Sequence, residues 1–198
     1  MILVVSIDSI DLLCLLADLP EFYVYRNNFP YKTFLSLRWR VELITLKYDV
    51  ASLRRGSKAI HDYVTEPSKA KEAFDRRRNE YKLDPVIVKE LKRRADDCLI
   101  IVFSAEWCPD CFRNIPVLDL LSEATGIEVR IFGHMMRDDK SNTRKWAVPP
   151  SPPEVDEFNV VKIPLMVVLR KDGEKLGEII ENPPQGKTLE QAPLEIIK

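Results

Sequence analysis

The C-terminal half of the chain alternates between short, wholly apolar runs and amphipathic stretches. Residues 98–103 (CLIIVF) are continuously apolar and give way to small and polar residues, which is typical of a strand buried on both faces of a sheet. A helix is predicted from about Pro109 to Ala124, and a second apolar strand over residues 127–133. Strand, helix and strand in this order predict a right-handed crossover unit and a mainly parallel sheet.

Two further strands are predicted after a polar, proline-rich excursion over residues 137–160. Residues 165–170 form another apolar run, and residues 171–173 (KDG) are typical of a tight turn. Residues 174–181 alternate between apolar and polar positions, as the antiparallel partner in a hairpin does. The C-terminal half is therefore predicted to be an α/β structure that ends in a hairpin.

Amphipathic, helix-forming stretches flank these strands. From about residue 56 the chain turns helical, and residues 66–82 are rich in good helix formers. Asp84-Pro85 is a helix-start pair, because Asp caps free N–H groups and Pro fits the first helical position. A short terminal helix, weakened by an internal proline, is expected over residues 188–197. Two basic runs are interpreted as solvated helix faces, residues 76–78 and residues 92–94.

Residues 1–50 carry the weakest pattern in the chain. Val41, Leu43 and Thr45 alternate with their neighbours as the residues of one strand would. An alternative stays open at this point: a start codon too far upstream was chosen, and this segment is not part of the working protein.

The apolar stretch over residues 1–20 does not meet the requirements of a signal peptide or of a spanning helix. No Lys or Arg precedes the apolar run, no small-residue cleavage site follows it, and Asp8, Asp11 and Asp18 interrupt it. A lipid anchor on Cys14 is disfavoured by the same lack of basic residues, so Cys14 is interpreted as a small buried residue. A cytoplasmic location is therefore expected, where closely spaced cysteines indicate catalysis or metal binding more often than a structural disulfide.

Composition and charge exclude several classes of protein. The 198 residues include 30 Lys and Arg against 31 Asp and Glu, so a net charge of −1 gives no overall attraction to nucleic acid or to acidic membranes. With 45% hydrophobic and 31% charged residues, the chain is neither disordered nor an integral membrane protein in its composition. The charges are unevenly spread: residues 51–95 carry 13 basic and 7 acidic residues, whereas residues 96–198 carry 12 and 18.

The candidate chemistry is concentrated in residues 105–111 (AEWCPDC). Two cysteines separated by two residues at a strand-to-helix junction can close a small disulfide ring with little backbone movement. Cys108 lies at the predicted helix N-terminus, where unpaired N–H groups and the helix dipole stabilise a thiolate. Cys111, one turn inside, is expected to be shielded and to act second. Cys108 is therefore the expected nucleophile and Cys111 the expected resolving thiol of a redox-active disulfide.

Four features in order make residues 84–181 resemble the thioredoxin family. They are the strand and AEWCxxC segment (Leu99–Cys111), Pro116 five residues past the second cysteine, Ile163-Pro164 directly before a buried strand, and the KDGE turn at Lys171–Glu174. The resemblance implies a thioredoxin-like α/β fold with a central mixed sheet flanked by helices, here with a helical N-terminal extension. It divides the chain into an N-terminal segment of uncertain structure, residues 1–55, and a thioredoxin-like domain, residues 56–198.

The resemblance also implies a site, an activity and partners. Pro164 would be cis and packed opposite the disulfide, the backbone of Ile163 would hydrogen bond an extended substrate segment, and Trp107 would shield one side. The implied activity is thiol–disulfide exchange, and in particular disulfide reduction, with protein disulfides as substrates. Electrons would come from a separate reductase or a low-molecular-weight thiol. No nucleotide, flavin or metal is expected as a cofactor, and neither nucleic acid nor a membrane as a partner.

The two residues between the cysteines depart from the family's usual Gly-Pro. Pro109 gives no N–H to Cys108, and Asp110 adds a carboxylate, so both are expected to disfavour the thiolate and to favour a reducing couple. Arg113, one turn further on, could offset part of this effect.

Two further departures indicate accessory residues. Val102 replaces the buried acid that many thioredoxins carry on this strand, so proton transfer to or from Cys111 is expected to use another group, such as Glu106 or water. A parallel strand that ends at Gly133 would direct the residues that follow it toward the sheet edge that holds Cys108. These residues are candidate substrate contacts: His134, Met135, Met136 and Arg137.

Two alternatives to an oxidoreductase stay open at this point. Half of a zinc site would need further ligands, and the remaining cysteines and histidines show no ligand spacing: Cys14, Cys98, His61 and His134. Of these, Cys98 is interpreted as a buried strand residue and His61 as an ordinary surface residue. The second alternative is an interaction module of the same fold, with a regulatory disulfide and little catalytic turnover.

Overall fold

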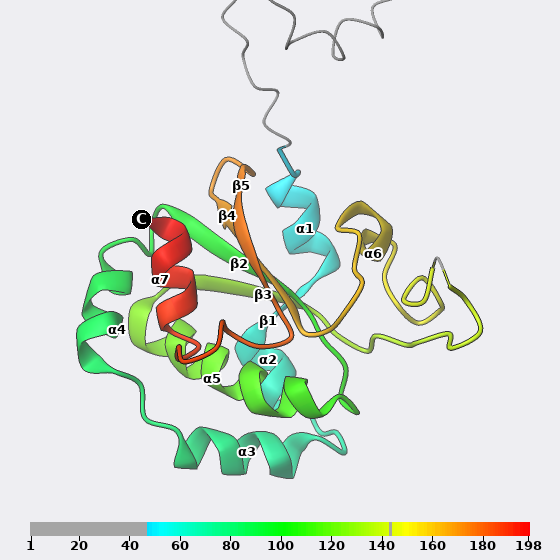
Figure 1. Ribbon diagram of the computed structural model, residues 1–198, viewed down its shortest axis with the longest axis horizontal. Coiled ribbons are helices and arrows are strands. Elements are labelled where there is room, and N and C mark those ends of the chain that lie inside the picture. Colours follow the sequence, from blue (N-terminus) through cyan, green and yellow to red (C-terminus); the bar gives the residue numbers. More distant parts are fainter. Residues whose placement is uncertain (1–46, 143) are drawn as a thin grey trace, which may run out of the picture. The chain divides into compact units, whose positions relative to one another are not determined.

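The computed structural model describes residues 47–142 and 144–198, which form one five-stranded sheet with helices packed against it (Figure 1). The strands are β1 (Lys58–Ala59), β2 (Cys98–Phe103), β3 (Glu128–Phe132), β4 (Leu165–Arg170) and β5 (Lys175–Ile180). The helices are α1 (Val50–Gly56), α2 (Ile60–Thr65), α3 (Lys71–Glu80), α4 (Pro85–Lys92), α5 (Pro109–Thr125), α6 (Glu154–Glu157) and α7 (Gln191–Ile197). The strand predicted over residues 41–45 and the buried position predicted for Cys14 lie outside the described residues.

The sheet is mixed, with the strand order β1-β3-β2-β4-β5. Among the described strands only β2 and β3 pair in parallel, and the other three neighbouring pairs are antiparallel. The expectation of a mainly parallel sheet is therefore wrong, whereas the mixed sheet implied by the family resemblance is confirmed. The physical reason is the connection after β3, which returns the chain into β4 in the opposite direction before the β4–β5 hairpin turns back. The central strand β2 is buried along its whole length, as its unbroken apolar run predicted.

Two elements at the start of the described chain were not predicted from the sequence. Helix α1 begins after Asp49, whose carboxylate accepts a hydrogen bond of 3.1 Å from the backbone N–H of Ser52. Strand β1 has two residues and pairs with the edge of β3. A two-residue strand leaves no periodic pattern in a sequence, whereas the Asp49 cap was a readable signal. Helix α1 also crosses the boundary expected between residues 55 and 56.

The predicted helices are present with shifted ends. Residues 66–70 form the turn between α2 and α3, so α3 is shorter than the helix predicted over residues 66–82. Helix α4 begins as predicted, with the Asp84 carboxylate accepting a 2.8 Å hydrogen bond from the Val86 N–H. Pro193 lies in the first turn of α7, where its missing N–H costs the helix no hydrogen bond. In the described part of the chain, no helix is long and apolar enough to span a membrane.

Helix α5 packs against the sheet, and α3 packs against α5 on the side away from the strands (Figure 1). Their contact includes an ion pair between Arg78 on α3 and Asp119 on α5, whose side chain is only 1% exposed. Arg78 also lies 2.8 Å from the carboxylate of Glu123, which is 66% exposed. The interpretation of residues 76–78 as a uniformly solvated face is therefore wrong for Arg78, because the helix turns this residue toward α5.

The proline-rich excursion is anchored to the rest of the fold by aromatic residues. Trp146 and Phe158 are buried, and the Phe158 ring stacks on Tyr48 with the ring centres 4.2 Å apart. Tyr48 itself is held at the β4–β5 turn, where its N–H donates a 2.9 Å hydrogen bond to the carbonyl of Gly173. Gly173 has φ +93°, and a Cβ there would lie 2.1 Å from the Tyr48 carbonyl oxygen, so this position requires glycine.

Candidate active site

The two cysteines lie at the start of α5, where the strand-to-helix junction was predicted. Cys108 is the residue before the helix and is 6% exposed, whereas Cys111 in the first turn is fully buried. The Cys108 thiol donates a hydrogen bond of 3.5 Å to the backbone carbonyl of Ile163. The Ile163–Pro164 peptide bond is cis, as the family resemblance implies. The structure therefore brings together four predicted site residues from two distant parts of the sequence.

The surroundings of the two thiols have opposite effects on their acidity. The pKa of Cys108 is lowered to about 6, first because the Cys111 side chain donates a hydrogen bond to it and then because the backbone N–H groups of Cys111 and Asp110 point at it. The pKa of Cys111 is raised, mainly by burial and then by the same hydrogen bond to Cys108. Near neutral pH this arrangement makes Cys108 the thiolate and Cys111 the thiol.

The direction of the Cys108 shift corrects one expectation from the sequence. Pro109 and Asp110 were expected to disfavour the thiolate. The Asp110 carboxylate does act in that direction, but it is the smallest of the influences on the Cys108 pKa, and the hydrogen bonds outweigh it. The sequence argument for a reducing couple therefore loses its basis, because a stabilised thiolate stabilises the reduced form.

Asp110 is held by Arg113, which the sequence indicated as its neighbour, and by Asn182, which the sequence did not indicate. Its carboxylate oxygen lies 3.1 Å from the Arg113 guanidinium and 3.0 Å from the side-chain amide nitrogen of Asn182. The side-chain amide of Asn114 donates to the backbone carbonyl of Glu181 at 2.7 Å. These contacts connect the first turns of α5 with the segment after β5 and give the Asp110 carboxylate two polar partners.

Trp107 stands at the side of the site with 46% of its surface exposed. Its indole N–H donates a 3.0 Å hydrogen bond to the carbonyl of Met135, and its ring stacks on Trp146 with the centres 6.0 Å apart. Met136 and Val161 are also exposed apolar residues. The segment after β3 and the excursion therefore supply the support for Trp107, a role that the polar composition of the excursion did not predict.

The four residues after Gly133 have different surroundings. His134 Nδ1 lies 2.9 Å from Glu106 Oε1, so these two predicted accessory residues are in contact. Met135 is buried, and Met136 is exposed. Arg137 instead pairs with Asp139 at 2.6 Å, a surface contact that does not connect it to the cysteines.

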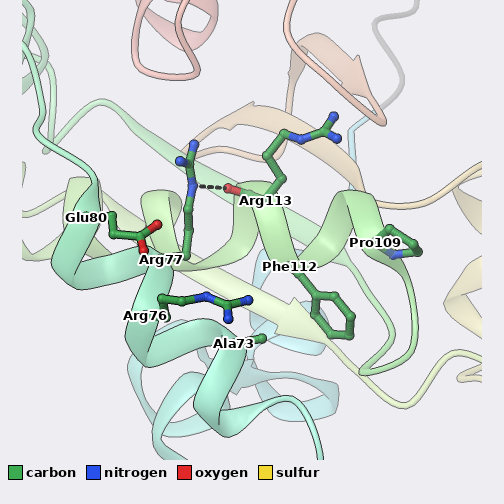
Figure 2. Close-up of a pocket in the computed structure, with 7 residues that line it drawn as sticks. All are labelled: Ala73, Arg76, Arg77, Glu80, Pro109, Phe112 and Arg113. Atoms are coloured by element: carbon green, nitrogen blue, oxygen red, sulfur yellow. Dashed lines mark hydrogen bonds between the residues drawn. The ribbon is translucent and has the colours of Figure 1, made fainter.

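A groove of about 250 Å³ runs beside the site, between α3 and the start of α5. Figure 2 shows Arg76 reaching toward Phe112 and Arg77 donating to the backbone carbonyl of Arg113, at 3.1 Å. The groove is lined by Ala73, Arg76, Arg77, Glu80, Pro109, Phe112 and Arg113. The basic stretch before the sheet therefore lies next to the motif, and the acidity of residues 96–198 does not by itself set the charge around Cys108.

The remaining candidates do not form a metal centre. Within residues 47–142 and 144–198, no three His, Cys, Asp or Glu side chains are grouped to hold a metal ion. Cys98 is fully buried in β2, and burial raises the pKa of its thiol. His61 is on α2 with its side chain 63% exposed, 3.4 Å from the carboxylate of Asp119. Neither residue contributes to the cysteine pair.

A mixed sheet with a cysteine pair at the start of the helix after its central strand, opposite a cis-proline, defines a protein of the thioredoxin-like fold. Residues 57–193 match a family model described as Thioredoxin. The chain belongs to the thioredoxin family. A comparison with curated protein sequences finds no match.

Similar solved structures show the same fold at low sequence identity. A protein of unknown function from Pseudomonas aeruginosa is similar over 76% of this chain and 95% of its own, with 22% identity and a TM-score of 0.56. An HIV epitope scaffold is similar over 75% of this chain and 88% of its own, with 21% identity and a TM-score of 0.53. These likenesses extend the fold beyond the region of the motifs and leave the activity to be argued from the site.

Proposed function

We propose that this protein is a thiol–disulfide oxidoreductase that exchanges a Cys108–Cys111 dithiol and disulfide with protein substrates. The observation that carries the proposal is the pair of opposite environments on one helix turn: an acidic, slightly exposed Cys108 against the cis-proline loop, and a buried Cys111 beneath it. A thiolate is the nucleophile in disulfide exchange, and a shielded second thiol can resolve the mixed disulfide.

The exchange runs in two steps. The Cys108 thiolate attacks one sulfur of the substrate disulfide, and the other substrate sulfur leaves as a thiolate. Cys111 then loses its proton and attacks Cys108 Sγ, which closes the protein disulfide and releases the second substrate thiolate. Two electrons have moved from the protein dithiol to the substrate, and the cycle needs a separate reductase or a low-molecular-weight thiol to restore the dithiol.

Exposed apolar side chains near Cys108 and the adjacent cis-proline loop suit an extended polypeptide substrate. Trp107, Met136 and Val161 offer apolar surface, and the cis-proline loop at Ile163 offers backbone groups. We expect the protein to act as a disulfide reductase in a cytoplasmic setting. Because the Cys108 thiolate is stabilised, the reduction potential is the quantity that tests this direction.

The direct test is a disulfide-reduction assay on the wild type, Cys108→Ser and Cys111→Ser. The wild type should turn over, Cys108→Ser should not, and Cys111→Ser should accumulate mixed disulfides through Cys108. No activity of the wild type above background, together with disulfide-dependent binding of a partner, would favour an interaction module. Equilibration with glutathione at a value well above about −200 mV would contradict the reductase direction.

A further inference from the structure

Three buried polar atoms, from α2 and from the segment just before α5, have no hydrogen-bond partner among the described residues. They are Tyr63 Oη, Ser104 Oγ and Glu106 Oε1. Two other such atoms, on Arg78 and Asp119, face each other as an ion pair. Native proteins pair nearly all of their buried polar groups, so an unpaired cluster indicates a catalytic role or a bound water.

The cluster is assembled from three parts of the chain. Tyr63 comes from α2, and Ser104 and Glu106 come from the segment between β2 and α5. Gly133 makes room for the Tyr63 ring, because a Cβ at Gly133 would lie 2.3 Å from a carbon atom of that ring. His134 follows with φ +57°, a left-handed conformation that non-glycine residues adopt mainly at special sites.

The cluster connects Cys111 with the surface. Burial is the main cause of the raised pKa of Cys111, and the Ser104 hydroxyl acts in the opposite direction, as a polar group close to the thiol does. Burial likewise raises the pKa of Tyr63, and the side chains of Ser104 and Glu106 also act on it, so both lie close to its hydroxyl without being aligned as hydrogen-bond partners. Glu106 Oε1 in turn lies 2.9 Å from Nδ1 of His134, although the two atoms are not aligned as a hydrogen bond.

The outer end of this series opens to solvent. A cavity of about 380 Å³ is lined by Tyr63, His134 and Lys58, with Gly56 and Gly133 at its walls. The His134 side chain is 51% exposed. A proton that reaches Glu106 or His134 can therefore leave the protein, whereas Cys111 itself has no exposed surface.

We propose that Ser104, Tyr63 and Glu106 form a proton relay for Cys111, with His134 as its exit to solvent. The inference rests on the proposed function, because it concerns the step in which Cys111 resolves the mixed disulfide. Catalytic hydrogen bonds that are long or poorly aligned in a free enzyme tighten when the substrate is bound, and the relay requires this of its three side chains. The Cys111 S–H bond then breaks and its proton passes to the Ser104 hydroxyl, whose own proton passes to the Tyr63 hydroxyl. The Tyr63 proton passes to the Glu106 carboxylate. The Cys111 thiolate forms the bond to Cys108 Sγ, and the substrate thiolate leaves with the electron pair of the broken S–S bond.

The charged and titratable groups around the relay come from four elements. Tyr63 faces it from α2, His134 from the segment after β3, and Cys108 and Cys111 from α5. Lys58 of β1 lines the cavity but is paired with Glu66 at 2.7 Å. Glu106 lies 2.9 Å from His134, which lines the cavity, whereas Glu66 pairs with Lys58 at the surface.

The test uses the reduced protein and dithiobis(nitrobenzoate), which releases one coloured thiolate at each step. The first release is second order and reports attack by Cys108; the second is first order and reports resolution by Cys111. In Glu106→Gln and Tyr63→Phe, the first rate should stay within about twofold, and the second should fall by about 10²-fold or more, the range of a lost acid–base group. Glu66→Gln removes a nearby surface carboxylate and should leave both rates unchanged.

The pH profile separates a relay from a structural role. In the Glu106→Gln variant solvent must take the proton, so the second rate should rise by about tenfold per pH unit, more steeply than in the wild type. The relay would be overturned if Glu106→Gln and Tyr63→Phe released the second thiolate as fast as the wild type. It would also be overturned if these variants slowed both releases equally. A wild type that releases no thiolate at all would instead overturn the proposed function, so the two failures are distinct.

Discussion

Two carboxylates on the helical side of the sheet, Asp119 and Glu106, have opposite surroundings. Asp119 is 1% exposed and meets the guanidinium of Arg78, with His61 at 3.4 Å. Glu106 has one oxygen buried without a hydrogen bond and one neighbour, His134, that is itself half exposed. A fully buried carboxylate that is paired with an arginine stabilises helix packing. Glu106 is 20% exposed, and its buried oxygen without a hydrogen bond indicates a use other than packing.

The largest effect is expected at Asp119. Asp119→Ala leaves the half-buried Arg78 guanidinium without its buried partner, which should lower the free energy of unfolding by about 3–5 kcal/mol. The matched control is Glu123→Ala, which removes the 66% exposed partner of the same arginine and should cost about 1 kcal/mol or less. Chemical denaturation of the reduced proteins measures both, and equal losses would contradict the distinction between the two pairs.

A smaller effect on stability is expected at Gly133, which packs against the Tyr63 ring near Glu106. Gly133→Ala places a Cβ against the Tyr63 ring, and overpacking of this kind costs about 1–3 kcal/mol. Because the ring must move, the resolution rate of Cys111 should fall as well. Gly126→Ala, at a glycine with no atom near its added Cβ, is a control for the helix end, although its φ of +81° adds backbone strain. An unchanged melting temperature in Gly133→Ala would show that Tyr63 is not packed there.

Glu106→Gln should change the stability least of these substitutions. The amide has the size of the carboxylate, and the contact with the half-exposed His134 is worth about 1 kcal/mol or less. Denaturation should therefore show an unfolding free energy close to that of the wild type while resolution slows. A loss of unfolding free energy as large as that of Asp119→Ala would show that Glu106, like Asp119, stabilises the fold.

The last test is the slope of the unfolding free energy against pH. The pKa of Cys108 is lowered from 9.0 to about 6 in the folded protein, so the unfolded chain binds more protons between these values. The stability that this thiol contributes is present above about pH 9 and is lost as the pH falls through about 6. The free energy of unfolding of the reduced wild type should therefore exceed that of Cys108→Ala by an amount that increases with pH over this window. A difference that falls with pH would contradict the assignment of the thiolate to Cys108.

The sequence indicated most of the site and little of its surroundings. Cys108, Cys111, Ile163 and Pro164 carry local signatures, namely the CxxC spacing at a strand end and a proline before a strand, so they could be named in advance. Tyr63, Ser104 and Asn182 carry none, because a tyrosine on a short helix or a serine after a strand is common. Their roles depend on which residue lies opposite them after folding.

The thiolate expectation failed for a related reason. From the sequence, Asp110 is the charge next to Cys108 and should dominate its acidity. In the fold, Arg113 and Asn182 hold that carboxylate, and the hydrogen bond from Cys111 has the larger effect. Adjacency along the chain identified the groups that act on Cys108, but their geometry decided the sign.

The sequence by itself determined strands β2 to β5, the helix that follows β2, and the two thiols at their junction, because these follow from runs of apolar residues and from spacing within one turn. The tertiary structure alone decided that β4 enters the sheet antiparallel, that α3 brings arginines beside the motif, and that one Glu106 oxygen is buried without a hydrogen bond from the described residues. These outcomes depend on contacts between residues far apart in the chain, and the local sequence pattern does not specify such contacts.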